Sequence, residues 1–168
     1  LREESGPLDG QCLAYFGDAN TVARSLAVAC ARLGVQFAIA APQGYQFDDA
    51  FLKRVEKECD ASTVTATDDP KQAVASANAV YTDVWASMGQ EAERDKRQKD
   101  FAAFQVNEQL MRQAPQDAIF LHCLPARRGE EVTDGVMDSA NSRIVEQAAN
   151  RMHVQKAIIA WLLGVKDL

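Results

Sequence analysis

The sequence has no long apolar run and no excess of positive charge. No stretch approaches the roughly 18 consecutive apolar residues of a membrane-spanning helix, and no charged-then-apolar leader opens the chain. With 18 basic and 24 acidic residues, the formal charge is −6. We therefore expect no membrane and no nucleic-acid partner. The basic residues at 94–99 alternate with acidic ones, which predicts a solvated face.

Cysteine is scarce, and the four cysteines do not suggest a disulfide framework. Cys12 lies in an apolar run, Cys30 in a helical pattern and Cys59 near the end of another. A reduced, cytoplasmic protein is the simpler interpretation. No C-x-x-C motif exists to complete a tetrahedral zinc site, and the adjacent His122 and Cys123 point apart on an extended segment. We expect no metal.

The glycines of a dinucleotide-binding fingerprint are absent. That fingerprint, G-x-G-x-x-G, lets the backbone approach a pyrophosphate, whereas Gly17 is followed by Asp18 and by no second or third glycine. An aspartate at this turn would also repel phosphate, so we do not expect a dinucleotide. The chain has no internal repeat, low-complexity tract or interdomain linker, and residues 1–168 are predicted to form one domain.

Apolar runs and helical patterns alternate along the chain. The runs that predict strands are residues 11–16, 35–40, 63–67, 79–82 and 118–121. Helical spacing predicts helices at 21–33, 51–59, 71–77 and 107–114, a helical turn from Thr133, and a closing helix with an apolar stripe at 154–165. Residues 143–146 fit a last short strand. The alternation predicts an α/β fold, a doubly wound, mainly parallel sheet with helices on both faces, Rossmann-like.

Three predicted strands end in polar residues outside any periodic pattern. Residues 17–21 follow the first strand, Asp83 the fourth, and His122-Cys123 the fifth, where Pro125 prevents further strand pairing. In parallel sheets such ends share an edge at which ligands bind. Each also has a purely structural interpretation: a turn with a helix cap, a loop carboxylate, a buried histidine and a small buried thiol. Their coincidence favours a site but names no reaction.

These residues belong to longer motifs that resemble those of the ornithine carbamoyltransferases. The motifs are Gly17-Asp18-x-Asn20, Asp83-x-Trp85-x-Ser87-Met88-Gly89, His122-Cys123-Leu124-Pro125 and Asn150-Arg151-x-His153-x-x-Lys156-Ala157. They cover nearly the whole chain, in the order of the family's second, amino-acid-binding domain. The resemblance implies transfer of a carbamoyl group from carbamoyl phosphate to the side-chain amine of L-ornithine. L-citrulline and phosphate form, in arginine biosynthesis, without a metal or an organic cofactor.

The resemblance implies an ornithine site. Asp83 would hold the ammonium group of ornithine, while Ser87 and Met88 would contact its α-carboxylate and α-amino end on a closing loop. Asn20 and the next residue would complete the site. The family usually has a second asparagine at that next position, where this chain has Thr21.

The resemblance also implies a carbamoyl phosphate site. Cys123 would lie beside the reacting amine, Leu124 would offer its carbonyl oxygen to the carbamoyl group, and Arg151 would meet carbamoyl phosphate. His122 would have a supporting role. With Asp83 as its neighbour, Cys123 is expected to position and polarise rather than to form a covalent bond. The sequence leaves open which group takes the proton of the amine.

The family's first domain carries serine-threonine-arginine-threonine and histidine-proline-x-glutamine segments, and this chain has neither. We therefore expect residues 1–168 to be the C-terminal half of a longer protein, able to fold but not to turn over alone. Its family is trimeric, so the full-length protein is expected to be a homotrimer or a multiple of one. Two alternatives stay open: a carbamoyltransferase for N-acetylornithine or putrescine, and a non-catalytic amino-acid-binding α/β domain.

Overall fold

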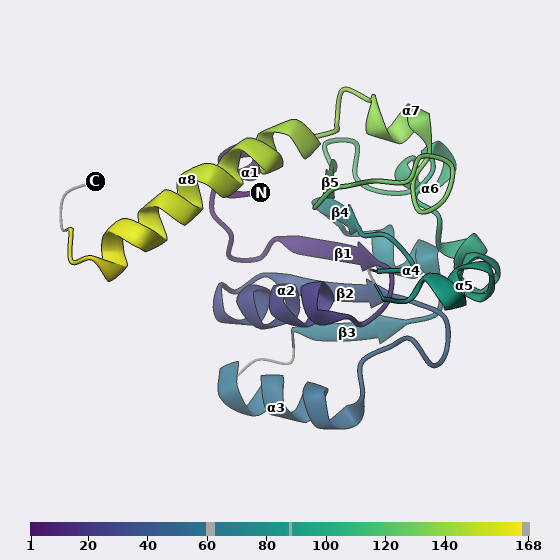
Figure 1. The fold of residues 1–168 in the computed structure, drawn as a ribbon, viewed down its shortest axis with the longest axis horizontal. Coiled ribbons are helices and arrows are strands. Elements are labelled where there is room, and N and C mark those ends of the chain that lie inside the picture. Colours follow the sequence, from purple (N-terminus) through teal and green to yellow (C-terminus); the bar gives the residue numbers. More distant parts are fainter. Residues whose placement is uncertain (60–62, 88, 166–168) are drawn as a thin grey trace.

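A five-stranded sheet, parallel throughout, forms the centre of the molecule (Figure 1). The computed structural model describes residues 1–59, 63–87 and 89–165. The strands are β1 (Cys12–Phe16), β2 (Gln36–Ala40), β3 (Val64–Thr67), β4 (Ala79–Thr82) and β5 (Ile119–His122). The predicted doubly wound, parallel α/β fold is confirmed, and each of these strands overlaps a run that predicted it.

The strand order is β3-β2-β1-β4-β5, so the direction of winding reverses at β1. Leu13 of β1 pairs with Phe37 of β2 on one side and with Ala79 of β4 on the other. The chain first moves outward to β3 and then crosses back to β4 and β5. Such a reversal is a topological switch point, where the loops after the two neighbouring strands separate and leave room for a ligand.

Every residue of β1, β4 and β5 is buried. This burial explains why these strands are continuous apolar runs rather than alternating ones, because helices cover both faces of a doubly wound sheet. On one face, the ring of Tyr15 stacks with those of Phe37 and Tyr81, with centroids 6.1 and 5.6 Å apart. The core therefore lies directly beneath the carboxyl edge of the sheet.

The connections between strands contain the helices α2 (Thr21–Arg32), α3 (Asp49–Cys59), α4 (Pro70–Val74), α5 (Arg94–Phe101) and α6 (Glu108–Met111). A short α1 (Arg2–Ser5) precedes β1, and a short α7 (Asp134–Met137) follows β5. Asn20, Asp69 and Asn107 accept backbone N–H groups at the starts of α2, α4 and α6. The helix α2 contacts α3 and β2, and α4 contacts α6 and β1. Because parallel crossovers are right-handed, the two pairs cover opposite faces.

The C-terminal segment differs from the prediction in two ways. Residues 143–146 do not form a strand: Ser142 makes one isolated bridge with Phe120, and α8 (Ile144–Leu162) begins immediately afterwards. The predicted helix is present, but α8 has no buried residue and extends away from the sheet (Figure 1). None of the helices in the described ranges has the length and hydropathy needed to cross a bilayer.

Candidate functional site

Asp83 directly follows β4 and is the centre of a polar cluster. Its Oδ1 accepts the backbone N–H of Val84 at 2.8 Å and lies 3.2 Å from the Sγ of Cys123. Its Oδ2 lies 3.3 Å from the amide nitrogen of Asn20. Asn20 follows β1 and Cys123 follows β5, so the structure brings together the three strand ends that the sequence singled out. The Asp83 carboxylate is only 7% exposed, and three donors surround it.

Cys123 is a protonated donor in this cluster. Burial, together with the negative charge of Asp83, raises the pKa of its thiol to about 12. The S–H group therefore remains intact at neutral pH and points to the Asp83 carboxylate. A thiolate nucleophile is disfavoured by this environment, because nucleophilic cysteines have lowered pKa values. In the described part of the chain, we find no group of three His, Cys, Asp or Glu side chains arranged to hold a metal.

Asn20 uses both ends of its side-chain amide. The oxygen accepts the backbone N–H of Ala23 at 3.0 Å, which caps α2, while the nitrogen reaches Asp83. The structural interpretation of Asn20 as a helix cap is thus correct, and the same contact fixes the amide beside the carboxylate. Thr21 begins α2 and is exposed.

His122 supports the loop that carries Cys123 and Leu124. Its Nδ1 accepts the backbone N–H of Leu124 at 2.8 Å, so the ring proton of the neutral form is on Nε2. That Nε2 lies 3.2 Å from Oε1 of Glu131, and both side chains are fully buried. Oε1 of Glu131 also accepts the backbone N–H of Arg127 at 2.5 Å. His122 and Glu131 therefore hold both ends of the loop.

The backbone of this loop is unusual. Leu124 has a φ of 59°, and the Leu124–Pro125 peptide is cis. A leucine rarely adopts a positive φ, and residues in such conformations are frequent at functional sites. Leu124 is 40% exposed, so a ligand in front of the sheet edge can reach the loop.

The other predicted site residues have different positions. Ser87 is half-buried in the loop after β4, and its N–H donates to the side chain of Gln90 at 3.1 Å. Met88 lies outside the described residues. Arg151 is exposed on α8, two turns from its start, and no hydrogen bond between described residues joins it to Asp83 or Cys123.

Two buried charged residues were not predicted. Glu131 lies outside every element that the sequence predicted, and Arg97 belongs to the charged segment expected to be solvated, yet they are 0% and 6% exposed. Each is buried against a polar partner that the fold brings to it: His122, nine residues away, for Glu131, and Asp18, 79 residues away, for Arg97. No local sequence pattern predicts the burial of either residue. In α5, the buried Phe101 lies one turn after Arg97, so the apolar residue at 101 is the one sign in the sequence that this side of the helix faces inward.

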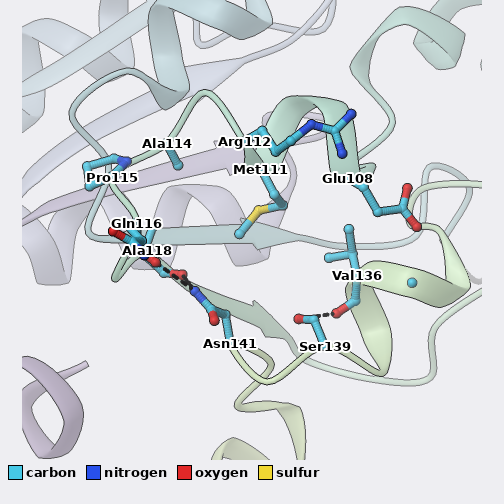
Figure 2. A pocket seen from close by; sticks show the side chains of 11 residues that line it. Glu108, Met111, Arg112, Ala114, Pro115, Gln116, Ala118, Val136, Ser139 and Asn141 are labelled. Carbon is cyan, nitrogen blue, oxygen red and sulfur yellow. Dashed lines mark hydrogen bonds between the residues drawn. The ribbon is translucent and has the colours of Figure 1, made fainter.

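A cavity of about 410 Å³ lies at a different place, between α6, α7 and the segment that leads into β5 (Figure 2). Its lining includes Met111, Pro115 and Val136. Ala118, which precedes β5, marks it as lying toward the amino end of that strand. Since ligands of doubly wound sheets bind at the carboxyl end, the cluster around Asp83 is the better candidate for the site.

Fold and site together define the class of protein: a doubly wound α/β domain that collects polar side chains at its switch point to bind a small ligand. The family model of the aspartate/ornithine carbamoyltransferase Asp/Orn binding domain matches residues 9–162. The chain belongs to this family.

Curated relatives and solved structures support the same family. The chain is 52% identical to the ornithine carbamoyltransferase of Anoxybacillus flavithermus over 97% of this chain and 52% of that protein. It is 49% identical to that of Thermococcus kodakarensis, over 98% and 53%. The ornithine carbamoyltransferase structure from Pyrococcus furiosus matches with a TM-score of 0.91 and 46% identity, over 99% of this chain and 54% of that one. The chain thus spans about half the length of these relatives.

Proposed function

We propose that this chain is the ornithine-binding half of an ornithine carbamoyltransferase. The observation that carries the proposal is the buried Asp83 carboxylate, with Asn20 and Cys123 beside it at the switch point. A carboxylate in this position suits the ammonium group of a dibasic amino acid, which would add a charge-assisted hydrogen bond. Ser87, further along the same loop, and Met88, the next residue in the sequence, would contact the α-carboxylate and α-amino groups.

In the proposed reaction, the side-chain amine of ornithine attacks the carbonyl carbon of carbamoyl phosphate. A C–N bond forms, the C–O bond to phosphate breaks, and the proton that the nitrogen loses ends on the released phosphate, which leaves as hydrogen phosphate. The amine must be neutral when it attacks, so a carboxylate that accepts a hydrogen bond from it helps to orient its lone pair. Closing the loop over the site would exclude water, which competes for the carbamoyl group.

Cys123 and Leu124 would face the carbamoyl group. The protonated thiol of Cys123, with its pKa raised to about 12, supports a role in positioning rather than in covalent catalysis. The carbonyl oxygen of Leu124 would accept a hydrogen bond from the carbamoyl nitrogen, and the loop held by His122 and Glu131 supports this geometry. Arg151 would contact carbamoyl phosphate.

The second half of the full-length protein would complete the site. Contact between that half and α8 is supported by an apolar stripe that is exposed in this structure. We call it the α8 stripe and define it as Val154, Ala157, Ile158, Trp161 and Leu162. Residues 1–168 would form one domain, and the other domain would bind carbamoyl phosphate. A homotrimer in the cytoplasm is part of the proposal, and the free state of all four cysteines is compatible with a reducing compartment.

Citrulline formation by the full-length protein tests the proposal. With carbamoyl phosphate present, ornithine should be carbamoylated, while N-acetylornithine and putrescine should react poorly because they lack the free α-amino group or the α-carboxylate. The isolated 168-residue chain should not turn over. Calorimetric titration after saturation with carbamoyl phosphate should rank the three amines in the same order. Binding of putrescine as tightly as ornithine would contradict the choice of substrate.

A further inference from the structure

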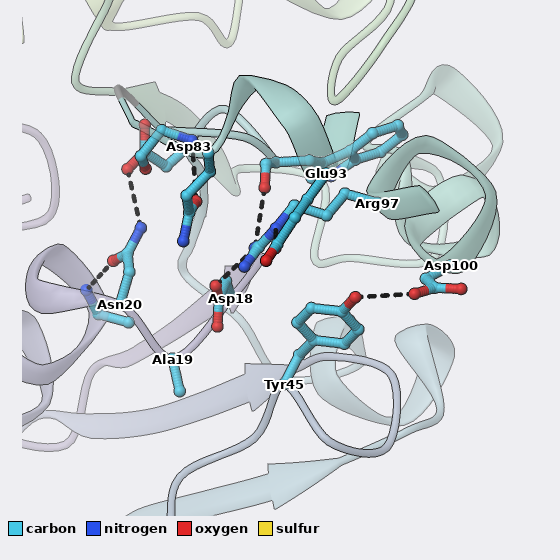
Figure 3. A network of polar contacts seen from close by, with 12 residues as sticks. Asp18, Ala19, Asn20, Tyr45, Asp83, Glu93, Arg97 and Asp100 are labelled. Carbon is cyan, nitrogen blue, oxygen red and sulfur yellow. Dashed lines mark hydrogen bonds and ion pairs between the residues drawn. The ribbon is translucent and has the colours of Figure 1, made fainter. Parts of the chain in front are cut away.

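Arg97 is a buried cation outside the cluster around Asp83. It belongs to α5, and its side chain is 7% exposed. Its Nη1 donates to the Asp18 carboxylate at 2.6 Å and to the carbonyl oxygen of Trp85 at 3.1 Å, and its Nε donates to Glu93 at 2.9 Å (Figure 3). A guanidinium group can make these contacts together because its donors lie in one fixed plane.

The contacts of Arg97 join segments that are distant in sequence. Asp18 is in the turn after β1, two residues before Asn20, and Trp85 is in the loop after β4, two residues before Ser87. Arg97 also lies 5.1 Å above the ring of Tyr45, whose carbonyl oxygen accepts the N–H of Ala19. One side chain therefore ties the turn that carries Asn20 to the loop that carries Ser87.

The loop after β4 is further fixed by packing. The ring of Trp85 is 5% exposed and stacks on Phe101, one turn along α5 from Arg97, with centroids 5.9 Å apart. Burial by itself would lower the pKa of Arg97, but the hydrogen bonds that it donates to Asp18 and Glu93 outweigh burial and raise the pKa. The guanidinium group of Arg97 therefore stays positively charged.

We propose that Arg97 is a positioning residue for amino-acid binding, one that holds the Trp85–Ser87 segment at the correct distance from Asn20 and Asp83. This inference rests on the proposed function, because it assumes that these segments hold ornithine from its two ends. Arg97 makes no contact with the reacting atoms in this proposal. Its loss should weaken ornithine binding much more than it weakens carbamoyl phosphate binding or slows the reaction at saturation.

Steady-state kinetics of the full-length protein test the proposal. Arg97→Ala should raise the KM for ornithine by about tenfold or more, since contacts to charged groups are lost, and leave the KM for carbamoyl phosphate within about twofold. Arg97→Lys keeps the charge but cannot reach three acceptors from one plane, so it should restore the KM only in part. An unchanged KM for ornithine, or an equal rise in both KM values, would overturn the inference.

Arg143 provides a matched control. It pairs with Glu4 at 2.7 Å and donates to the carbonyl oxygens of Ala140 and Ser142, so it resembles Arg97 in its contacts. It lies where α8 begins, beside the residues that precede β1 and β4. Arg143→Ala should leave the KM for ornithine unchanged. If Arg97→Ala does not fold, Asp18→Asn, which keeps the volume and removes the charge, carries the same expectation.

Trp85 gives a measurement that does not depend on activity. In a Trp161→Phe background, Trp85 is the single tryptophan of this chain, because the sequence has two. Arg97→Ala should shift its fluorescence to longer wavelength and increase quenching by acrylamide, as the loop separates from α5. Unchanged fluorescence would overturn the inference. Absence of citrulline formation by the unaltered protein would instead refute the proposed function. The fluorescence measurement would then still test whether Arg97 holds the loop of Trp85.

Discussion

The Asp83 carboxylate lies at a position that is nearly closed to water. The N–H of Val84, the amide of Asn20 and the S–H of Cys123 all donate to it, so its oxygens have hydrogen-bond partners before any ligand binds. Donors to a carboxylate favour its ionised form, and the same negative charge disfavours a thiolate next to it. Burial and the negative charge of Asp83 raise the pKa of the Cys123 thiol, so Cys123 stays a neutral donor beside the carboxylate, which fits a site for a cationic amine.

The reactivity of Cys123 should report this coupling. Asp83→Asn removes the negative charge, so the pKa of Cys123 should fall from about 12 toward the ordinary 9.0 but stay above it, because burial is the larger cause. Iodoacetamide should then alkylate Cys123 faster at pH 9 in the variant than in the unaltered chain, as followed by peptide mass mapping. Asp138 is a surface carboxylate that pairs with Arg128, and Asp138→Asn should leave the rate of Cys123 alkylation unchanged. Slower alkylation in Asp83→Asn would show that the charge of Asp83 does not raise the pKa.

At the scale of elements, β5 and the loop after it form one unit with Glu131. The carboxylate accepts from His122 and from the backbone of Arg127, while its second oxygen, Oε2, is buried and has no hydrogen-bond partner among the described residues. The loop of Cys123 and Leu124 is therefore held by a residue that lies beyond it in sequence. Oε1 of Glu131 holds one end of the loop through Arg127, and His122 holds the other end through the N–H of Leu124.

Replacing Glu131 should destabilise the chain in proportion to the hydrogen bonds lost. Glu131→Ala leaves two buried donors without an acceptor and should lower the free energy of unfolding by about 3 kcal/mol. Glu131→Gln keeps Oε1 as an acceptor and should cost only about 1 kcal/mol. Urea unfolding of the two variants measures the difference. Equal losses would mean that the cavity, and not the hydrogen bonds, determines the cost.

The elements that the sequence predicts well are those with local causes. Buried strands such as β1 and β5 are apolar runs, and α2 begins at a cap that Asn20 supplies. The meeting of Asn20, Asp83 and Cys123 was predictable as well, because parallel strands share one carboxyl edge. The burial of Arg97 and Glu131 was not, since each depends on a partner that only the folded chain brings near. The predicted strand at residues 143–146 is wrong for a related reason: the apolar residues there form the start of α8.

At the scale of the whole molecule, α8 is the element that the rest of the domain does not cover. Near its start it packs on the sheet: Gln147 accepts the N–H of His122 at 3.1 Å and donates to the hydroxyl of Tyr81 at 3.2 Å. Residues spaced three or four apart continue the same face into the α8 stripe, where Trp161 is 74% and Leu162 70% exposed. A face that begins as an interface and continues as an exposed apolar surface is typical of an interface with a further partner.

The α8 stripe should matter for the full-length protein and not for the stability of this domain. Replacing Trp161 and Leu162 with glutamate should leave thermal unfolding of the 168-residue chain nearly unchanged, because both side chains are exposed. In the full-length protein, the same double substitution should expose the contact between halves, lower the unfolding temperature and increase cleavage by protease between them. Lys156→Glu adds a glutamate on the opposite side of α8 and should have neither effect. If the double variant unfolds like the unaltered full-length protein, the second half does not cover α8, and the uncovered stripe must meet some other surface.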